Sequence, residues 1–110
     1  MKKINILKNN RDFDKIIKNN RAYKSKNTYI YIERTNEQNY HFGISVSKKI
    51  GNAVTRNLYK RRLKNIVDKN NYQNNFNCII ILKKSVLSIS YFELEKELIE
   101  AFENLKIIKE

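Results

Sequence analysis

The chain lacks proline and tryptophan, and its 110 residues include only two glycines, one cysteine and one histidine. Because breakers are so scarce, the sequence offers no linker, and we expect residues 1–110 to form a single domain with one modest core. A lone cysteine, Cys78, cannot form an internal disulfide, which points to a reducing compartment. The sequence shows no targeting segment, so we expect the protein to be cytoplasmic. No apolar run approaches the roughly 20 residues that a membrane span needs, so no membrane partner is expected.

Acidic residues are missing from the middle of the chain, since no Asp or Glu occurs between Glu37 and Asp68. Seven cations stand in that interval: Lys48, Lys49, Arg56, Lys60, Arg61, Arg62 and Lys64. The whole chain carries a formal net charge of +12. A surface helix is stabilised by opposite charges three or four residues apart, so a helix of one sign gives up stability. This pattern is typical of a protein that binds a polyanion, of which the phosphate backbone of nucleic acid is the commonest.

The hydrophobic pattern predicts three helices, over residues 10–20, 52–68 and 90–105, and three strands, over 29–32, 40–47 and 78–82. A further short strand at 22–23 has weaker support. Asn9 or Asn10 and Asn52 are candidate helix caps, and Ser90 with Glu93 fits a capping box. The polar turn at 35–39 suggests that the first two strands form a hairpin. The order α, β, β, α, β, α predicts an α+β fold in which helices and a sheet form a sandwich.

The central helix separates into two faces when it is projected at about 100° per residue. Its core arc contains Tyr59, Leu63, Ile66 and Val67. An adjacent arc forms what we call the basic stripe, which contains Asn57, Lys60, Arg61 and Lys64. Arg62 lies apart from the stripe, and Arg56 falls near the core arc. The alternative interpretation is that the stripe is only a solvated face.

The run from Ser45 to Lys64, with its Arg56-Asn57-x-x-Lys60-Arg61 pattern, resembles the signature of the bacterial ribonuclease P protein component. A Leu7-Lys-x-x-x-Asp12-Phe13 pattern and the strand around Tyr31 extend the resemblance over most of the chain. The fold that it implies is a two-layer α/β sandwich similar to the second domain of ribosomal protein S5. It includes a left-handed βαβ crossover, against the usual right-handed rule, with the central helix joining strands 42–46 and 78–82.

The resemblance also implies a function. Proteins of this family bind a large catalytic RNA, ribonuclease P RNA, and the complex removes the 5′ leader from precursor tRNA. The RNA performs the hydrolysis with Mg²⁺, and the protein alone binds no cofactor. The basic helix would bind RNA, and a cleft between that helix and the sheet would hold the single-stranded leader. The implied RNA contacts are Lys48, Lys49, Arg56, Asn57, Lys60, Arg61 and Lys64, and the implied cleft residues are Phe13, Ile17 and Tyr31. Cations position phosphates and aromatic rings stack on unpaired bases, so these residue types fit.

Three positions depart from the family pattern. Leu58 stands where Arg is common, Ile17 where many members have an aromatic residue, and Lys64 where an Arg would offer a planar fork. A non-catalytic RNA-binding module, such as a ribosomal or assembly protein, is the alternative function. A nuclease with its own metal site is the third, and the lack of clustered His, Asp and Glu argues against it. His41 has no evident catalytic partner and is expected to be a satisfied strand residue, as Cys78 is expected to be a small core residue.

Overall fold

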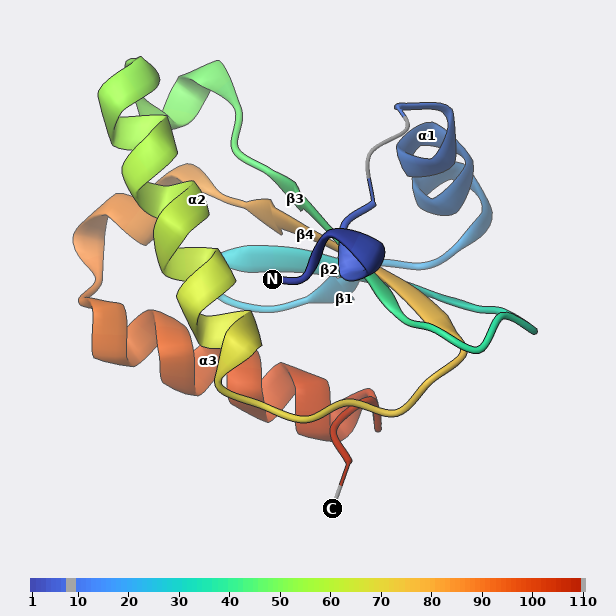
Figure 1. Cartoon of the computed structure of the whole chain (residues 1–110). Helices are drawn as coiled ribbons and strands as arrows, with labels where there is room; N and C mark the ends of the chain where they lie inside the picture. The colour runs from blue at the N-terminus through green and yellow to red at the C-terminus, as the bar shows by residue number, and fades with distance from the viewer. Residues whose placement is uncertain (8–9, 110) are drawn as a thin grey trace.

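The computed structural model describes residues 1–7 and 10–109 and shows a four-stranded sheet with helices on both of its faces (Figure 1). The elements in chain order are the 3-10 helix η1 (Lys3–Asn5), α1 (Asn10–Asn19), β1 (Tyr23–Lys24), β2 (Thr28–Arg34), β3 (His41–Ser45), the 3-10 helix η2 (Lys48–Ile50), α2 (Ala53–Asp68), β4 (Phe76–Leu82), the 3-10 helix η3 (Lys84–Ser88) and α3 (Tyr91–Asn104). The predicted helices and strands are therefore confirmed. The expected cap at Asn9 lies outside the described residues.

The strand order is β1-β2-β4-β3, so the predicted hairpin is wrong. β4 lies between β2 and β3 and pairs antiparallel with the first and parallel with the second. The apolar β4 run is buried on both faces of the sheet, and a central place gives it neighbours along both edges as well. The turn that suggested a hairpin instead passes the start of β4, where the backbone N–H of Thr35 donates to the carbonyl of Asn75 at 2.9 Å.

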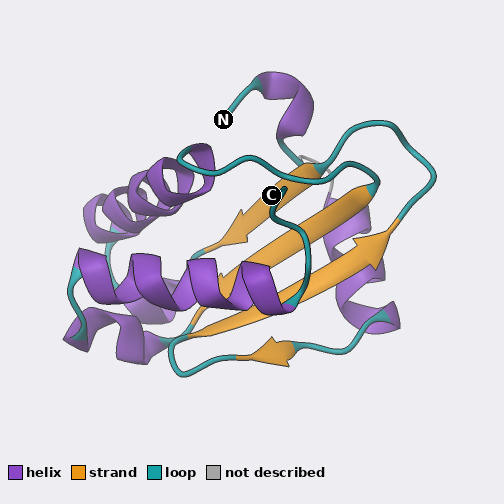
Figure 2. Ribbon diagram, turned by 90° about the horizontal axis from the view of Figure 1, so that it is seen from below, coloured by secondary structure: helices purple, strands orange, loops and turns teal. Residues whose placement is uncertain are grey.

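The helices α2 and α3 cover one face of the sheet, and α1 lies against the other (Figure 2). The first face holds the main core, because alternate residues of each strand point toward α2 and α3. Buried residues of this core include Ile30, Phe42, Phe76, Ile80, Leu63, Ile66, Leu98 and Phe102. Sheet, α2 and α3 form the expected two-layer sandwich, and α2 connects the parallel strands β3 and β4 as the βαβ crossover.

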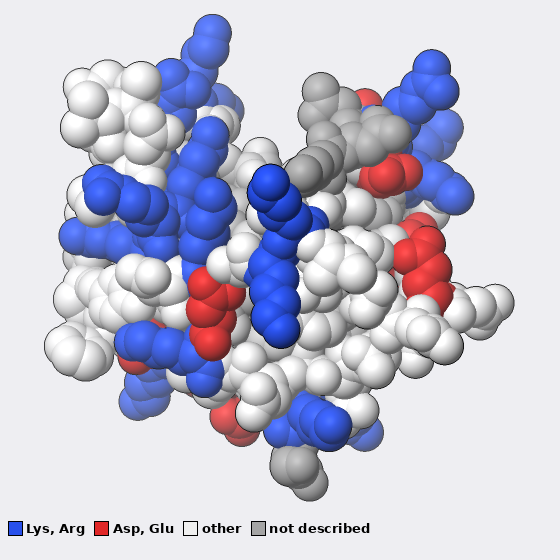
Figure 3. Space-filling view, in the orientation of Figure 1, with Lys and Arg blue, Asp and Glu red and all other residues white. Residues whose placement is uncertain are grey.

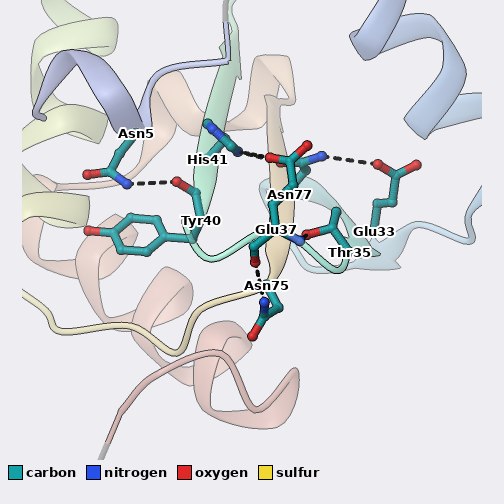
Figure 4. A network of polar contacts seen from close by, with 8 residues as sticks. All are labelled: Asn5, Glu33, Thr35, Glu37, Tyr40, His41, Asn75 and Asn77. Carbon is teal, nitrogen blue, oxygen red and sulfur yellow. Dashed lines mark hydrogen bonds and ion pairs between the residues drawn. The ribbon is translucent and has the colours of Figure 1, made fainter.

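Polar side chains fill the opposite face at the end of the sheet where β3 and β4 begin (Figure 4). The ring of His41 shares a hydrogen bond of 2.8 Å between its Nδ1 and Oδ1 of Asn77, whose amide nitrogen donates to Glu33 at 3.0 Å. Nearby, the amide nitrogen of Asn5 donates to the carbonyl of Tyr40 at 2.7 Å and fixes η1 to the start of β3. The expectation that His41 is a satisfied strand residue is confirmed.

Candidate RNA-binding surface

The orientation of α2 follows from its cap and its apolar face. The side chain of Asn52 accepts a hydrogen bond from the backbone N–H of Thr55 at 3.0 Å, as an N-cap residue does. Four side chains of the helix are buried against the core: Tyr59, Leu63, Ile66 and Val67. These are the residues of the predicted core arc. Because they face inward, the neighbouring arc of the helix must face solvent.

All four residues of the basic stripe, Asn57, Lys60, Arg61 and Lys64, are exposed. Lys48 and Lys49 are also exposed, on η2 immediately before α2. Among residues 1–7 and 10–109, none of these cations takes part in an ion pair. Figure 3 shows Lys and Arg side chains gathered over α2, with a hollow between this helix and α1. The surface is therefore positive and uncompensated, which favours a polyanion.

Two arginines of α2 lie outside the stripe, as the projection predicted. Arg56 is half-buried, and its Nε is shielded from solvent with no hydrogen-bond partner among the described residues. The guanidinium of Arg62 lies 5.2 Å from the centroid of the Tyr59 ring, in a cation–π contact on the flank of the helix. Arg56 thus carries a desolvated donor that the rest of the described chain does not satisfy, a state that lowers stability.

A groove of about 510 Å³ lies between α1 and α2 beside the second half of β3, the last strand on this side of the sheet. Its lining residues are Phe13, Asp14, Ile17, Ile44, Ser45, Val46 and Lys60. Two of the three expected cleft residues, Phe13 and Ile17, thus face a cation of the basic stripe, Lys60. The groove borders the sheet and the basic helix as expected, and α1 supplies its far wall. The resemblance already placed Phe13 and Ile17 of this helix in the cleft, but the acidic Asp14 was not expected there.

The third expected cleft residue, Tyr31, does not line this groove. It is half-buried in β2, on the α1 face of the sheet, and it pairs with Ile79 of β4, which pairs in turn with Gly43 of β3. Two strand spacings, about 10 Å, therefore separate Tyr31 from Gly43. A chain lying in the groove would have to continue across the sheet to reach Tyr31.

The position of α1 depends on a close approach at Gly43. A Cβ atom at this residue would lie 2.4 Å from Cζ of the Phe13 ring, so only glycine lets the ring lie on the strand. On the same helix Ile16 is 1% exposed and anchors α1 to the sheet. A glycine inside a strand pattern was the available sequence signal for this contact, but it did not reveal which residue would approach.

Other side chains that could carry chemistry have structural surroundings. Cys78 is fully buried, and burial raises the pKa of its thiol, so it is confirmed as a small core residue. Within the described ranges, no group of three or more His, Cys, Asp or Glu side chains could hold a metal ion. No helix in the same ranges is long and apolar enough to cross a membrane.

Comparison with known proteins agrees with this architecture. The family model described as Ribonuclease P matches residues 1–106. The ribonuclease P protein component of Streptococcus pneumoniae is 34% identical over 112 residues, which cover 100% of this chain and 91% of that protein. A Staphylococcus aureus RNase P protein mutant with defective mRNA degradation activity gives a TM-score of 0.85 at 28% identity, covering 96% of this chain and 91% of that one.

The RNase P protein from Thermotoga maritima gives a TM-score of 0.77 at 22% identity and covers 86% of this chain and 92% of that chain, which supports the fold alone. A crossover of the opposite hand would not permit a TM-score of 0.85 over 96% of the chain. The βαβ unit therefore has the same hand as that of the Staphylococcus aureus structure. The family resemblance implies that this hand is left.

Proposed function

This chain belongs to the ribonuclease P protein family, and we propose that it acts as the protein subunit that binds ribonuclease P RNA and the 5′ leader of precursor tRNA. As a member of the family it is a subunit of a ribonuclease that acts in tRNA 5′ processing. The finer assignment concerns which surface binds which part of the RNA. The catalytic RNA would lie along the basic stripe and η2, and the leader would lie in the groove between α1 and α2.

The observation that carries this proposal is the position of Lys60. Its side chain belongs to the exposed basic stripe and also lines the groove with Phe13 and Ile17. A single-stranded leader needs a cation for its phosphates and apolar or aromatic faces for its unstacked bases, and the groove offers both. Duplex RNA hides its base faces, so a groove of this composition favours a single strand.

We propose further that the chemistry resides in the RNA, with Mg²⁺ bound by RNA phosphates rather than by this chain. The described side chains support this division, since His41 is held by Asn77 and Cys78 is buried. We propose that the protein acts in the cytoplasm, together with the catalytic RNA and the precursor tRNA. A non-catalytic RNA-binding module remains the alternative, and the assay that separates the two is cleavage.

The test is reconstitution of the full chain with ribonuclease P RNA transcribed in vitro, at fixed Mg²⁺ concentration. The protein alone should not cleave precursor tRNA, and with the RNA it should tighten binding of precursor tRNA much more than of mature tRNA. Equal tightening of both substrates would remove the leader assignment and leave a protein that only stabilises the RNA. Binding to ribosomal RNA without any stimulation of cleavage would favour the alternative.

The geometry also ranks two expected leader contacts. Phe13→Ala should lose more of the leader-dependent affinity than Tyr31→Ala, because Phe13 lines the groove beside Lys60 and Tyr31 lies farther along the sheet. Stacking of one base on an aromatic ring contributes on the order of 1–3 kcal/mol, which sets the upper range for each variant. The measurement is the affinity ratio for substrates with and without a leader. A larger loss in Tyr31→Ala would move the leader path away from the groove and onto the sheet.

A further inference from the structure

Two large apolar side chains are exposed on the most basic helix of the molecule. Val54 is 78% exposed and Leu58 is 38% exposed, both in the first half of α2. They are four residues apart, so they lie one above the other on the same face of the helix. Arg61 follows three residues after Leu58 and continues this row. We call Val54 and Leu58 together the apolar step.

The apolar step has no partner within the protein core. The core-facing side of α2 starts at Tyr59, and neither residue of the apolar step belongs to the buried cluster or to the side chains packed against it. A single exposed leucine or valine would need no explanation. Val54 and Leu58 are adjacent on a helix whose exposed side chains between Asn57 and Asn65 are otherwise cations and amides, so the two form a small apolar surface of a distinct kind.

We propose that the apolar step is a contact site for the face of an unpaired base in the RNA that the basic stripe binds. This inference rests on the proposed function, because it concerns the same RNA partner. The surrounding charge selects the partner: Lys60, Arg61 and the lysines of η2 lie nearby in the chain and would repel a basic protein surface but attract phosphate. Figure 3 shows uncharged surface at the end of α2, flanked by Lys and Arg.

An RNA can satisfy both parts of this surface only where it is not fully paired. Phosphates lie on the outside of any RNA, but a flat apolar base face becomes available when a base is unstacked from its neighbours. Side chains four residues apart on a helix cover a patch about 6 Å long, close to the size of one base. The ligand is therefore a nucleotide of a loop, bulge or junction, whose phosphates would meet Arg61 and Asn57.

Leu58 gives the site its preference for an apolar contact over a phosphate contact. Sequence resemblance indicates that an arginine is common at this position, where it would add a phosphate contact. In this chain a leucine removes that ionic contact and extends the apolar surface begun by Val54. The contribution of the apolar step should accordingly depend little on salt, whereas each phosphate contact contributes to the salt dependence of binding.

The test is a titration of ribonuclease P RNA transcribed in vitro, with affinity measured at several salt concentrations. Val54→Ser and Leu58→Ser should each weaken binding by about threefold to tenfold at every salt concentration, since each removes apolar area from the contact. Their lines of log affinity against log salt should run parallel to the wild-type line. Lys60→Ala should instead flatten its line, and Leu58→Arg should steepen it by about one unit.

Two controls make the result specific. Phe92→Ser changes a side chain that is 79% exposed on α3, away from the basic stripe, and should leave RNA affinity unchanged. A fully paired RNA duplex offers phosphates but no free base face, so the serine variants should bind it as the wild type does. Circular dichroism melting curves check that each variant is folded.

Three results would overturn the inference. Wild-type affinity in both serine variants would show that the apolar step touches nothing in the complex. An equal loss on duplex RNA would show that the contact is not an unpaired base. If the wild-type protein does not bind ribonuclease P RNA at all, the proposed function fails and this inference fails with it. If the wild type binds but both serine variants bind equally well, only this inference fails.

Discussion

Substitution of Gly43 by alanine should displace α1 and narrow or distort the groove without touching the main core. The added Cβ would lie 2.4 Å from Cζ, 2.9 Å from Cε1 and 3.0 Å from Cε2 of the Phe13 ring. Carbon atoms in contact prefer a separation of about 3.5 Å or more, so the ring must retreat by about 1.1 Å (3.5 − 2.4). The ring belongs to the helix that Ile16 anchors, so the strain falls on the attachment of α1 to the sheet.

Overpacking of this kind costs about 1–3 kcal/mol of unfolding free energy. For a domain of about this size, 1 kcal/mol lowers the melting temperature by roughly 4 °C or more. Far-ultraviolet circular dichroism is the suitable probe of unfolding in guanidinium chloride, because the chain has no tryptophan whose fluorescence could report it. The same variant, reconstituted with ribonuclease P RNA, should lose part of its preference for precursor tRNA over mature tRNA, because Phe13 no longer occupies its place in the groove.

A double variant isolates the contact. In Gly43→Ala with Phe13→Leu, the shorter side chain leaves room for the new methyl group, so the combined cost should be smaller than the sum of the single costs. Ser45→Ala is the matched control, since it changes a residue of the same strand and the same groove without a clash. If Gly43→Ala unfolds at the wild-type denaturant concentration and the two single costs simply add, the ring does not lie on the strand.

Four further variants test the remaining assignments. Lys60→Ala and Arg61→Ala should each weaken RNA binding and lower its salt slope by about one unit while leaving the fold as stable or more stable; unchanged binding in both folded variants would identify the stripe as a solvated face. Arg56→Met removes a shielded, unpartnered Nε, so it should raise the unfolding free energy by up to about 1 kcal/mol and still weaken RNA binding; a marked loss of stability would contradict this. His41→Ala should lower the unfolding free energy by about 1 kcal/mol, because the hydrogen bond to Asn77 is lost. The single-turnover cleavage rate of the saturated complex should stay unchanged, and a slower chemical step would refute the structural role of His41.

The helices could be predicted from the sequence because their signals are local. The core arc of α2 was identified residue by residue, since a helix of 16 residues repeats its apolar spacing several times. The cap of α3 followed in the same way: Ser90 accepts from the backbone N–H of Glu93 at 3.1 Å, and the reciprocal bond is present. Phe92 shows the limit of residue type alone, because it is a large apolar side chain of α3 and yet is 79% exposed.

The order of the strands could not be predicted, because pairing is not local. A polar turn between two strand-like segments favours a hairpin, but the later β4 run is apolar on both faces and takes the central place. That insertion puts Gly43 beside Ile79 and moves Tyr31 two strands away from the edge where the groove lies. The location of the groove and the exclusion of Tyr31 from its lining thus both follow from one non-local pairing.

The features that favour RNA binding share a physical property: each lowers the stability of the free protein. Like charges repel along α2, and the Nε of Arg56 is shielded from solvent without a hydrogen-bond partner among the described residues. The helix tolerates these costs because its other face is secured by the Asn52 cap and by four buried side chains. An RNA that neutralises the cations would remove the repulsion on binding, and covering the apolar step would add apolar burial that the free protein lacks. The exposed half of α2 is therefore best understood as one half of an interface, whose energetic balance is completed by a partner rich in phosphate and in unpaired bases.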